Sequence, residues 1–131
     1  MTGGEIGRLL VERRPGAVLA TITGEIDLSN AGQLEDAFAS AVGDATAVVL
    51  DLSGLEYIDS AGLAVLSRLS RRMTDRGGAL RLVVPDTATV RRTLTIAGVD
   101  AVLPVDPTAE EALAAVTEPP PPSQAEQVDR A

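Results

Sequence analysis

The sequence predicts an α/β fold, a single domain whose mixed central β-sheet is covered by helices. The first indication is that short apolar runs in the second half of the chain alternate with segments of helical apolar spacing. This alternation is typical of parallel strands joined by right-handed helical crossovers. The second indication is a pair of β-branched runs around a turn near the start, which predicts a hairpin and an antiparallel edge. A length of 131 residues suits one such domain.

The hairpin is expected to consist of strands at residues 9–11 and 17–23. Between them, Arg13-Arg14-Pro15-Gly16 is rich in turn formers. The second strand then stops at a corner with the sequence Gly24-Glu25-Ile26-Asp27. The hairpin therefore leads directly into the first helical segment.

The first helix is expected where apolar side chains recur every three or four positions, from residue 28 to residue 41. Either Asp27 or Ser29 is a suitable N-cap for it. Gly43-Asp44 ends the helix, and an unbroken apolar run follows at residues 47–50. Such a run is typical of a strand covered on both faces, so it is expected to be the central strand.

A second helix, ended by Gly77-Gly78, is expected from its apolar face, which consists of Leu63, Leu66, Leu69 and Met73. Four arginines fall on the outer side of this helix: Arg68, Arg71, Arg72 and Arg76. The remaining elements are a strand at residues 79–84, a short helix lined by Val90, Leu94 and Ala97, a weak edge strand at residues 101–103, and a helix at residues 107–116.

Both ends of the chain are expected to lie outside the folded domain. Residues 1–6 are assigned as a flexible N-terminus, residues 7–116 as the domain, and residues 117–131 as a disordered, Pro-rich tail. The tail has no apolar periodicity and contains four consecutive prolines. Such a segment cannot bury enough apolar surface to offset the entropy lost on ordering.

The composition argues against several classes of function. A formal net charge of -8 opposes contact with the phosphate backbone of nucleic acids. The absence of Cys excludes thiolate metal ligands and cysteine nucleophiles, and the absence of His removes the commonest general base and metal ligand. Asp27 and Asp59 lack a His or a third ligand to support acid–base chemistry or a Mg²⁺ site. We expect neither a metal, nor another cofactor, nor an enzyme activity.

The sequence also gives an expectation for the location of the protein. Its first residues lack the charged and then apolar pattern of a signal peptide, and no apolar run approaches the roughly 20 residues of a membrane helix. The expected location is the cytoplasm, without contact to a membrane.

The segment from Asp51 to Leu63 leads from the central strand into the second helix and is the most informative part of the chain. Loops at the carboxyl ends of parallel strands are where such sheets usually bind partners. Ser60 lies near the helix N-terminus, where free backbone N–H groups and the helix dipole favour an anionic phosphate. Gly62, a poor helix former, indicates a close approach at this turn. Taken alone, Asp59-Ser60-Ala61-Gly62 is also explained by a simple N-cap.

The longer segment resembles the signature of the STAS domain, the fold of bacterial anti-sigma factor antagonists. The resemblance covers roughly residues 7–116 and rests on the order of elements and on three motifs: Gly24-Glu25-Ile26-Asp27, Asp51-Leu52-Ser53-Gly54 and Ile58-Asp59-Ser60-Ala61-Gly62-Leu63. It implies that Ser60 is phosphorylated by an anti-sigma factor that is also a serine kinase. It further implies a partner-binding surface made of Asp27, Asp59, Ser60, Ala61 and Gly62.

The function implied by this resemblance is that of an anti-sigma factor antagonist. The unphosphorylated protein would bind the anti-sigma factor and release a sigma factor. Phosphorylation of Ser60 with ATP would end the binding, and a phosphatase would restore it. Two alternatives remain. One is a STAS subunit of a larger lipid-transport or stress-signalling assembly with Ser60 unmodified. The other is a nucleotide-binding module, although the chain has no Gly-rich phosphate loop with a Lys.

Overall fold

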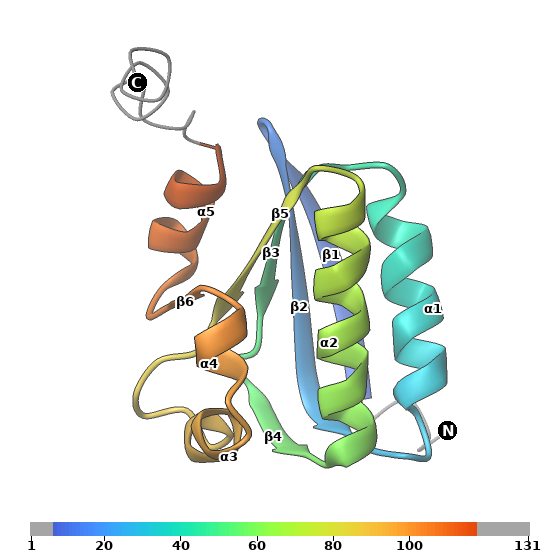
Figure 1. The fold of residues 1–131 in the computed structure, drawn as a ribbon, viewed down its shortest axis with the longest axis vertical. Helices are drawn as coiled ribbons and strands as arrows, with labels where there is room; N and C mark the ends of the chain where they lie inside the picture. The colour runs from blue at the N-terminus through green and yellow to red at the C-terminus, as the bar shows by residue number, and fades with distance from the viewer. Residues whose placement is uncertain (1–6, 118–131) are drawn as a thin grey trace, which may run out of the picture.

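The computed structural model describes residues 7–117 and confirms the predicted α/β class with a mixed sheet (Figure 1). Its elements are β1 (Gly7–Arg14), β2 (Ala17–Ile26), α1 (Ala31–Val42), β3 (Ala47–Asp51), β4 (Leu55–Ile58), α2 (Ser60–Asp75), β5 (Ala79–Val83), α3 (Arg91–Ile96), α4 (Val99–Val102), β6 (Val105–Asp106) and α5 (Ala109–Thr117). The expectations for residues 1–6 and 118–131 lie outside the described residues, and Thr117 is the last residue of α5.

The long strand β2 organises the sheet. Its antiparallel partner β1 forms the predicted hairpin edge, while β3 pairs in parallel with its first half and β4 with its last residues. The strand order is β1-β2-β3-β5-β6, with β4 beside the end of β2, and β3 is central as predicted. Because β2 and β4 are parallel, the loops that leave them emerge at the same edge of the sheet.

Helices cover the two faces of the sheet unequally. The α1 and α2 helices lie side by side across one face, and α5 lies on the other (Figure 1). Alternation along β3 sends Val48 and Leu50 into the larger cluster, which includes α1 and α2, and Val49 into the smaller cluster beneath α5. Phe38, the one phenylalanine, is buried in the larger cluster, which is otherwise aliphatic apart from Met73. The core thus holds the start of α2 against the ends of β2 and β4.

Two sequence-based expectations for short elements were wrong or incomplete. Residues 101–103 were expected to form an edge strand, but α4 occupies Val99–Val102 and the edge strand is β6. The chain aligns with β5 only from Pro104, whose carbonyl accepts a hydrogen bond from the Leu82 N–H at 2.9 Å. Strand β4 was not predicted, because its buried residues Leu55 and Ile58 are separated by two exposed ones and show no strand alternation.

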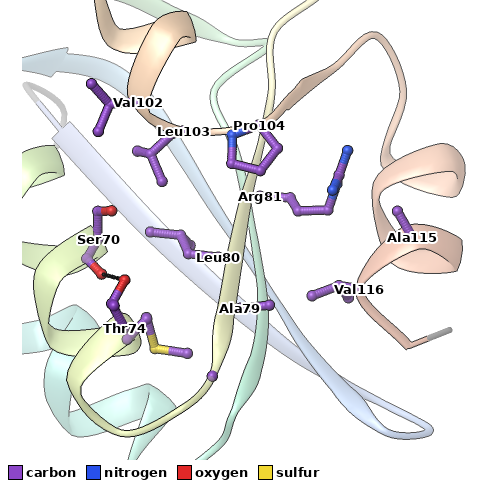
Figure 2. Close-up of a pocket in the computed structure, with 12 residues that line it drawn as sticks. Ser70, Thr74, Ala79, Leu80, Arg81, Val102, Leu103, Pro104, Ala115 and Val116 are labelled. Carbon is purple, nitrogen blue, oxygen red and sulfur yellow. Dashed lines mark hydrogen bonds between the residues drawn. The ribbon is translucent and has the colours of Figure 1, made fainter. Parts of the chain in front are cut away.

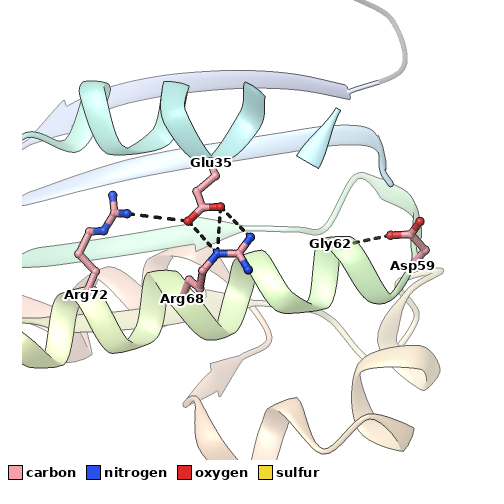
Figure 3. Close-up of polar contacts among 5 residues, drawn as sticks. All are labelled: Glu35, Asp59, Gly62, Arg68 and Arg72. Carbon is pink, nitrogen blue, oxygen red and sulfur yellow. Dashed lines mark hydrogen bonds and ion pairs between the residues drawn. The ribbon is translucent and has the colours of Figure 1, made fainter. Parts of the chain in front are cut away.

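The outer arginines of α2 are exposed as predicted, and two of them contact Glu35 of α1 (Figure 3). The Arg68 guanidinium donates hydrogen bonds from Nε at 3.0 and 3.1 Å and from Nη2 at 2.8 Å to the Glu35 carboxylate. Arg72 forms an ion pair with the same carboxylate at 3.8 Å. The hydrogen bonds from Arg68 hold the pKa of Glu35 below its ordinary value of 4.5, although partial burial opposes them.

This lowered pKa predicts a pH-dependent contribution of Glu35 to stability. A carboxyl whose pKa is lower in the folded state stabilises the protein above its unfolded pKa and loses this effect as the pH falls through the folded value. Replacing Glu35 with Gln should therefore reduce the free energy of unfolding at neutral pH. The difference from wild type should shrink as the pH falls below 4.5. Urea unfolding at several pH values measures it, and a difference that stays constant down to about pH 3 would contradict the assignment.

Candidate functional site

The parallel register of β2 and β4 brings two loops together. Glu25 pairs with Tyr57 and Ile26 with Ile58, and each strand is followed directly by an aspartate. The pairing ends at Ile26 and Ile58, so Asp27 and Asp59 leave the sheet side by side, and Ser60 follows Asp59 as the first residue of α2. The Asp59 N–H donates a hydrogen bond to the Ile26 carbonyl at 3.2 Å, which holds the two segments together beyond the strand ends.

Asp59 fixes the position of both loops. As the N-cap of α2, it accepts a hydrogen bond at Oδ1 from the Gly62 N–H at 3.0 Å (Figure 3). Its other carboxylate oxygen, Oδ2, accepts a hydrogen bond from the Leu28 N–H at 3.1 Å. One side chain therefore ties the start of α2 to the loop that follows β2. The N-cap interpretation of Asp59 is confirmed, and it adds to the functional one rather than replacing it.

The loop between β2 and α1 is held by its own polar side chains. Asp27 Oδ1 accepts hydrogen bonds from the Ser29 N–H at 2.9 Å and from Ser29 Oγ at 2.5 Å. The Asn30 amide donates to the Glu25 carbonyl at 2.8 Å and accepts from the Asp27 N–H at 2.9 Å. The N-cap of α1 is Asn30, so the expectation of Asp27 or Ser29 at that position was wrong. The side chains of Asp27 and Asn30 thus hold the loop together before the helix begins.

Ser60 is the first residue of α2 and is exposed. The first N–H groups of a helix have no intrahelical acceptor. Asp59 already occupies the Gly62 N–H, which leaves those of Ser60 and Ala61 at this terminus. Ser60 is thus exposed at a helix end that favours an anion.

Gly62 lies where α2 closely approaches the ends of β2 and β4. A Cβ at this position would lie 2.6 Å from Ile58 Cγ1, 2.9 Å from Ile26 Cγ2 and 3.0 Å from the Ile26 carbonyl oxygen. The close approach predicted at this glycine is present, and the neighbours are residues of β2 and β4. Gly62 is buried and Ala61 is half-buried against the core, whereas Asp27 and Asp59 are partly exposed.

The sequence interpretation missed Leu28 as a surface residue. Its spacing fits the apolar face of the predicted first helix, but the helix begins at Ala31 and Leu28 is 82% exposed in the preceding loop. Tyr57 is half exposed as well. Ser29 as an N-cap would have placed Leu28 before the helix, but the apolar spacing that continues through the loop favours a position on the helix face.

Other kinds of site find little support in the described chain. Residues 7–117 contain no cluster of three or more acidic side chains suited to a metal ion. No helix in that range is both long and apolar enough to cross a membrane.

A pocket of about 220 Å³ lies between the C-terminal half of α2, β5, the segment before β6 and α5 (Figure 2). Of the described residues that line it, only Arg81 is charged, and its Nε donates to Asp106 Oδ2 at 2.7 Å. This pairing raises the pKa of Arg81 above its ordinary value, chiefly through the hydrogen bond to Asp106. The guanidinium is already paired with a carboxylate, and the pocket lies at the opposite end of α2 from Ser60. It gives no support to a nucleotide-binding role.

The chain belongs to the STAS domain family, whose pattern it matches over residues 8–112. It is similar to RsfA of Mycobacterium tuberculosis, an anti-sigma-F factor antagonist, with 36% identity over 108 residues, covering 80% of this chain and 84% of RsfA. A crystal structure of an anti-sigma factor antagonist from Mycobacterium paratuberculosis superimposes with a TM-score of 0.76 at 34% identity, covering 86% of this chain and 95% of that one. SpoIIAA of Bacillus in its phosphorylated form shares the fold, with a TM-score of 0.62 at 22% identity over 83% of this chain and 99% of that one.

Proposed function

We propose that this chain is an anti-sigma factor antagonist that works by binding rather than by catalysis. Unphosphorylated, it binds an anti-sigma factor in the cytoplasm and thereby releases a sigma factor. The observation that carries this proposal is the exposed Ser60 at the start of α2, beside two aspartates in a hydrogen-bonded loop. The name of the relative RsfA supports the same function.

Phosphorylation of Ser60 ends the binding by changing the local charge. The anti-sigma factor acts as the serine kinase and transfers a phosphoryl group from ATP to Ser60 Oγ, and a phosphatase removes it by hydrolysis. The phosphate adds about -1.5 to -2 charges beside Asp27 and Asp59. Unit charges about 4 Å apart interact by roughly 1 to 4 kcal/mol at surface-like dielectrics, and about 1.4 kcal/mol changes an equilibrium tenfold. SpoIIAA, which shares this fold, has a phosphorylated form, and this supports such a modification here.

Locating the phosphate tests this proposal. The purified chain is incubated with ATP and each anti-sigma factor of its source organism, and intact-mass analysis with fragmentation follows. We expect one phosphate, on Ser60. The Ser60→Ala variant should remain unmodified, whereas Ser29→Ala, which removes the exposed serine of the neighbouring loop, should still be phosphorylated. A phosphate found on another residue, or no modification by an anti-sigma factor that binds the chain, would overturn the switch.

A further inference from the structure

Leu28 is an exposed apolar side chain at the proposed partner site. With 82% of its surface accessible, it is the most exposed of the large apolar residues in the described part of the chain, followed by Val102 at 75% and Ile96 at 74%. Single exposed apolar residues are common on protein surfaces. Its position beside Ser60 and the construction of its loop distinguish Leu28 from such residues.

The loop presents Leu28 in one fixed position. The backbone N–H of Leu28 donates to Asp59 Oδ2 at 3.1 Å, and the next N–H, that of Ser29, donates to Asp27 Oδ1 at 2.9 Å. Asn30 bonds back to the strand end on the other side of the loop. A partner that buries Leu28 therefore meets a loop that is already ordered, and it loses little affinity to the cost of ordering it.

Leu28 also lies where a kinase must dock. The Leu28 N–H donates to the carboxylate of Asp59, the residue directly before Ser60, and the same carboxylate caps the helix that Ser60 begins. A partner that brings a phosphate donor to Ser60 Oγ covers this neighbouring side chain. The flanking carboxylates of Asp27 and Asp59 define the chemistry that would surround it: an apolar pocket bordered by basic side chains.

We propose that Leu28 is the apolar anchor by which the anti-sigma factor holds this surface, its side chain entering such a pocket on the partner. The inference rests on the proposed function. It adds a binding residue that, unlike Ser60, has the same apolar side chain in both states of the switch. The phosphate on Ser60, together with the carboxylates of Asp27 and Asp59, determines whether the partner binds. Leu28 supplies much of the affinity. Burying a leucine side chain is worth enough to change affinity by about 10-fold to 100-fold.

The test is a titration calorimetry series with the anti-sigma factor of the source organism that binds the wild-type chain. Leu28→Ala should weaken binding by about 10-fold or more, and Leu28→Met should retain most of it. Leu10→Ala is the matched control, because Leu10 is a 58% exposed leucine within β1. It should bind within about twofold of wild type. In phosphorylation assays, Leu28→Ala should raise KM with kcat little changed, as expected for lost uniform binding.

The two proposals fail in different ways. If no anti-sigma factor binds the wild-type chain, the proposed function fails and this inference with it. If the wild type binds and Leu28→Ala binds equally well, only the anchor is overturned. The same holds if Leu10→Ala weakens binding as much as Leu28→Ala. Urea unfolding of each variant establishes that the exposed substitutions leave the fold intact.

Discussion

Ser60→Ala is expected to bind the anti-sigma factor constitutively, whereas Ser60→Asp should bind it at least about 10-fold more weakly. The alanine variant keeps the surface and removes the phosphate acceptor. The aspartate variant adds a carboxylate next to Asp59 and Asp27, at a position where the partner is expected to approach. Because Ser60 is exposed at the first position of α2, neither change disturbs the core.

Calorimetric titrations of both variants measure this difference, with and without ATP. Ser67→Asp provides the control, since it adds the same charge to an exposed position further along α2. It should bind like wild type. Raising the ionic strength should reduce the defect of Ser60→Asp, because salt shortens the range of charge repulsion to about 3 Å at 1 M. Equal affinities for Ser60→Ala and Ser60→Asp would rule out a charge switch at this residue.

The turn before α2 could be predicted from sequence because its geometry is local. A turn before a helix, with Asp59 as cap and Ser60 after it, needs only neighbouring residues to be recognised. The longer resemblance from Asp51 to Leu63 is what adds a functional hypothesis to this helix start. The structure adds how the site is assembled, since the contact between Asp59 and Leu28 joins residues 31 positions apart.

The features that sequence missed depend on tertiary contacts. Strand β4 is a short segment that exists as a strand because β2 extends far enough to pair with it. Leu28 continues the helical spacing of α1, so only the hydrogen bonds of Asn30 and Asp59 reveal that it lies in a loop. The edge strand was misplaced because residues 101–103 are apolar and resemble a strand, whereas the actual strand, residues 105–106, is too short to stand out in the sequence. Pro104 sets where pairing with β5 begins.

Gly62→Ala is expected to destabilise the protein, although alanine is the better helix former. The added Cβ would lie 2.6 Å from Ile58 Cγ1 and 3.0 Å from the Ile26 carbonyl oxygen, so α2 must move away from the sheet. Overpacking of this kind costs about 1 to 3 kcal/mol, which exceeds the helix-propensity gain of up to about 1 kcal/mol. A shifted α2 would also stretch the hydrogen bond between Asp59 and the Gly62 N–H and displace Ser60 from the Leu28 loop.

Gly32→Ala is the matched control, because a Cβ on this helical glycine of α1 would meet nothing within 4 Å beyond its chain neighbours and its own helix backbone. Alanine there should stabilise the protein by up to about 1 kcal/mol. Urea unfolding of the two variants should thus give free-energy changes of opposite sign, and affinity for the anti-sigma factor should fall only for Gly62→Ala. If both Gly62→Ala and Gly32→Ala stabilised the protein, α2 could move away from the end of β2 at little energetic cost. The fixed relation between Ser60 and Leu28, on which the proposed binding surface depends, would then not hold.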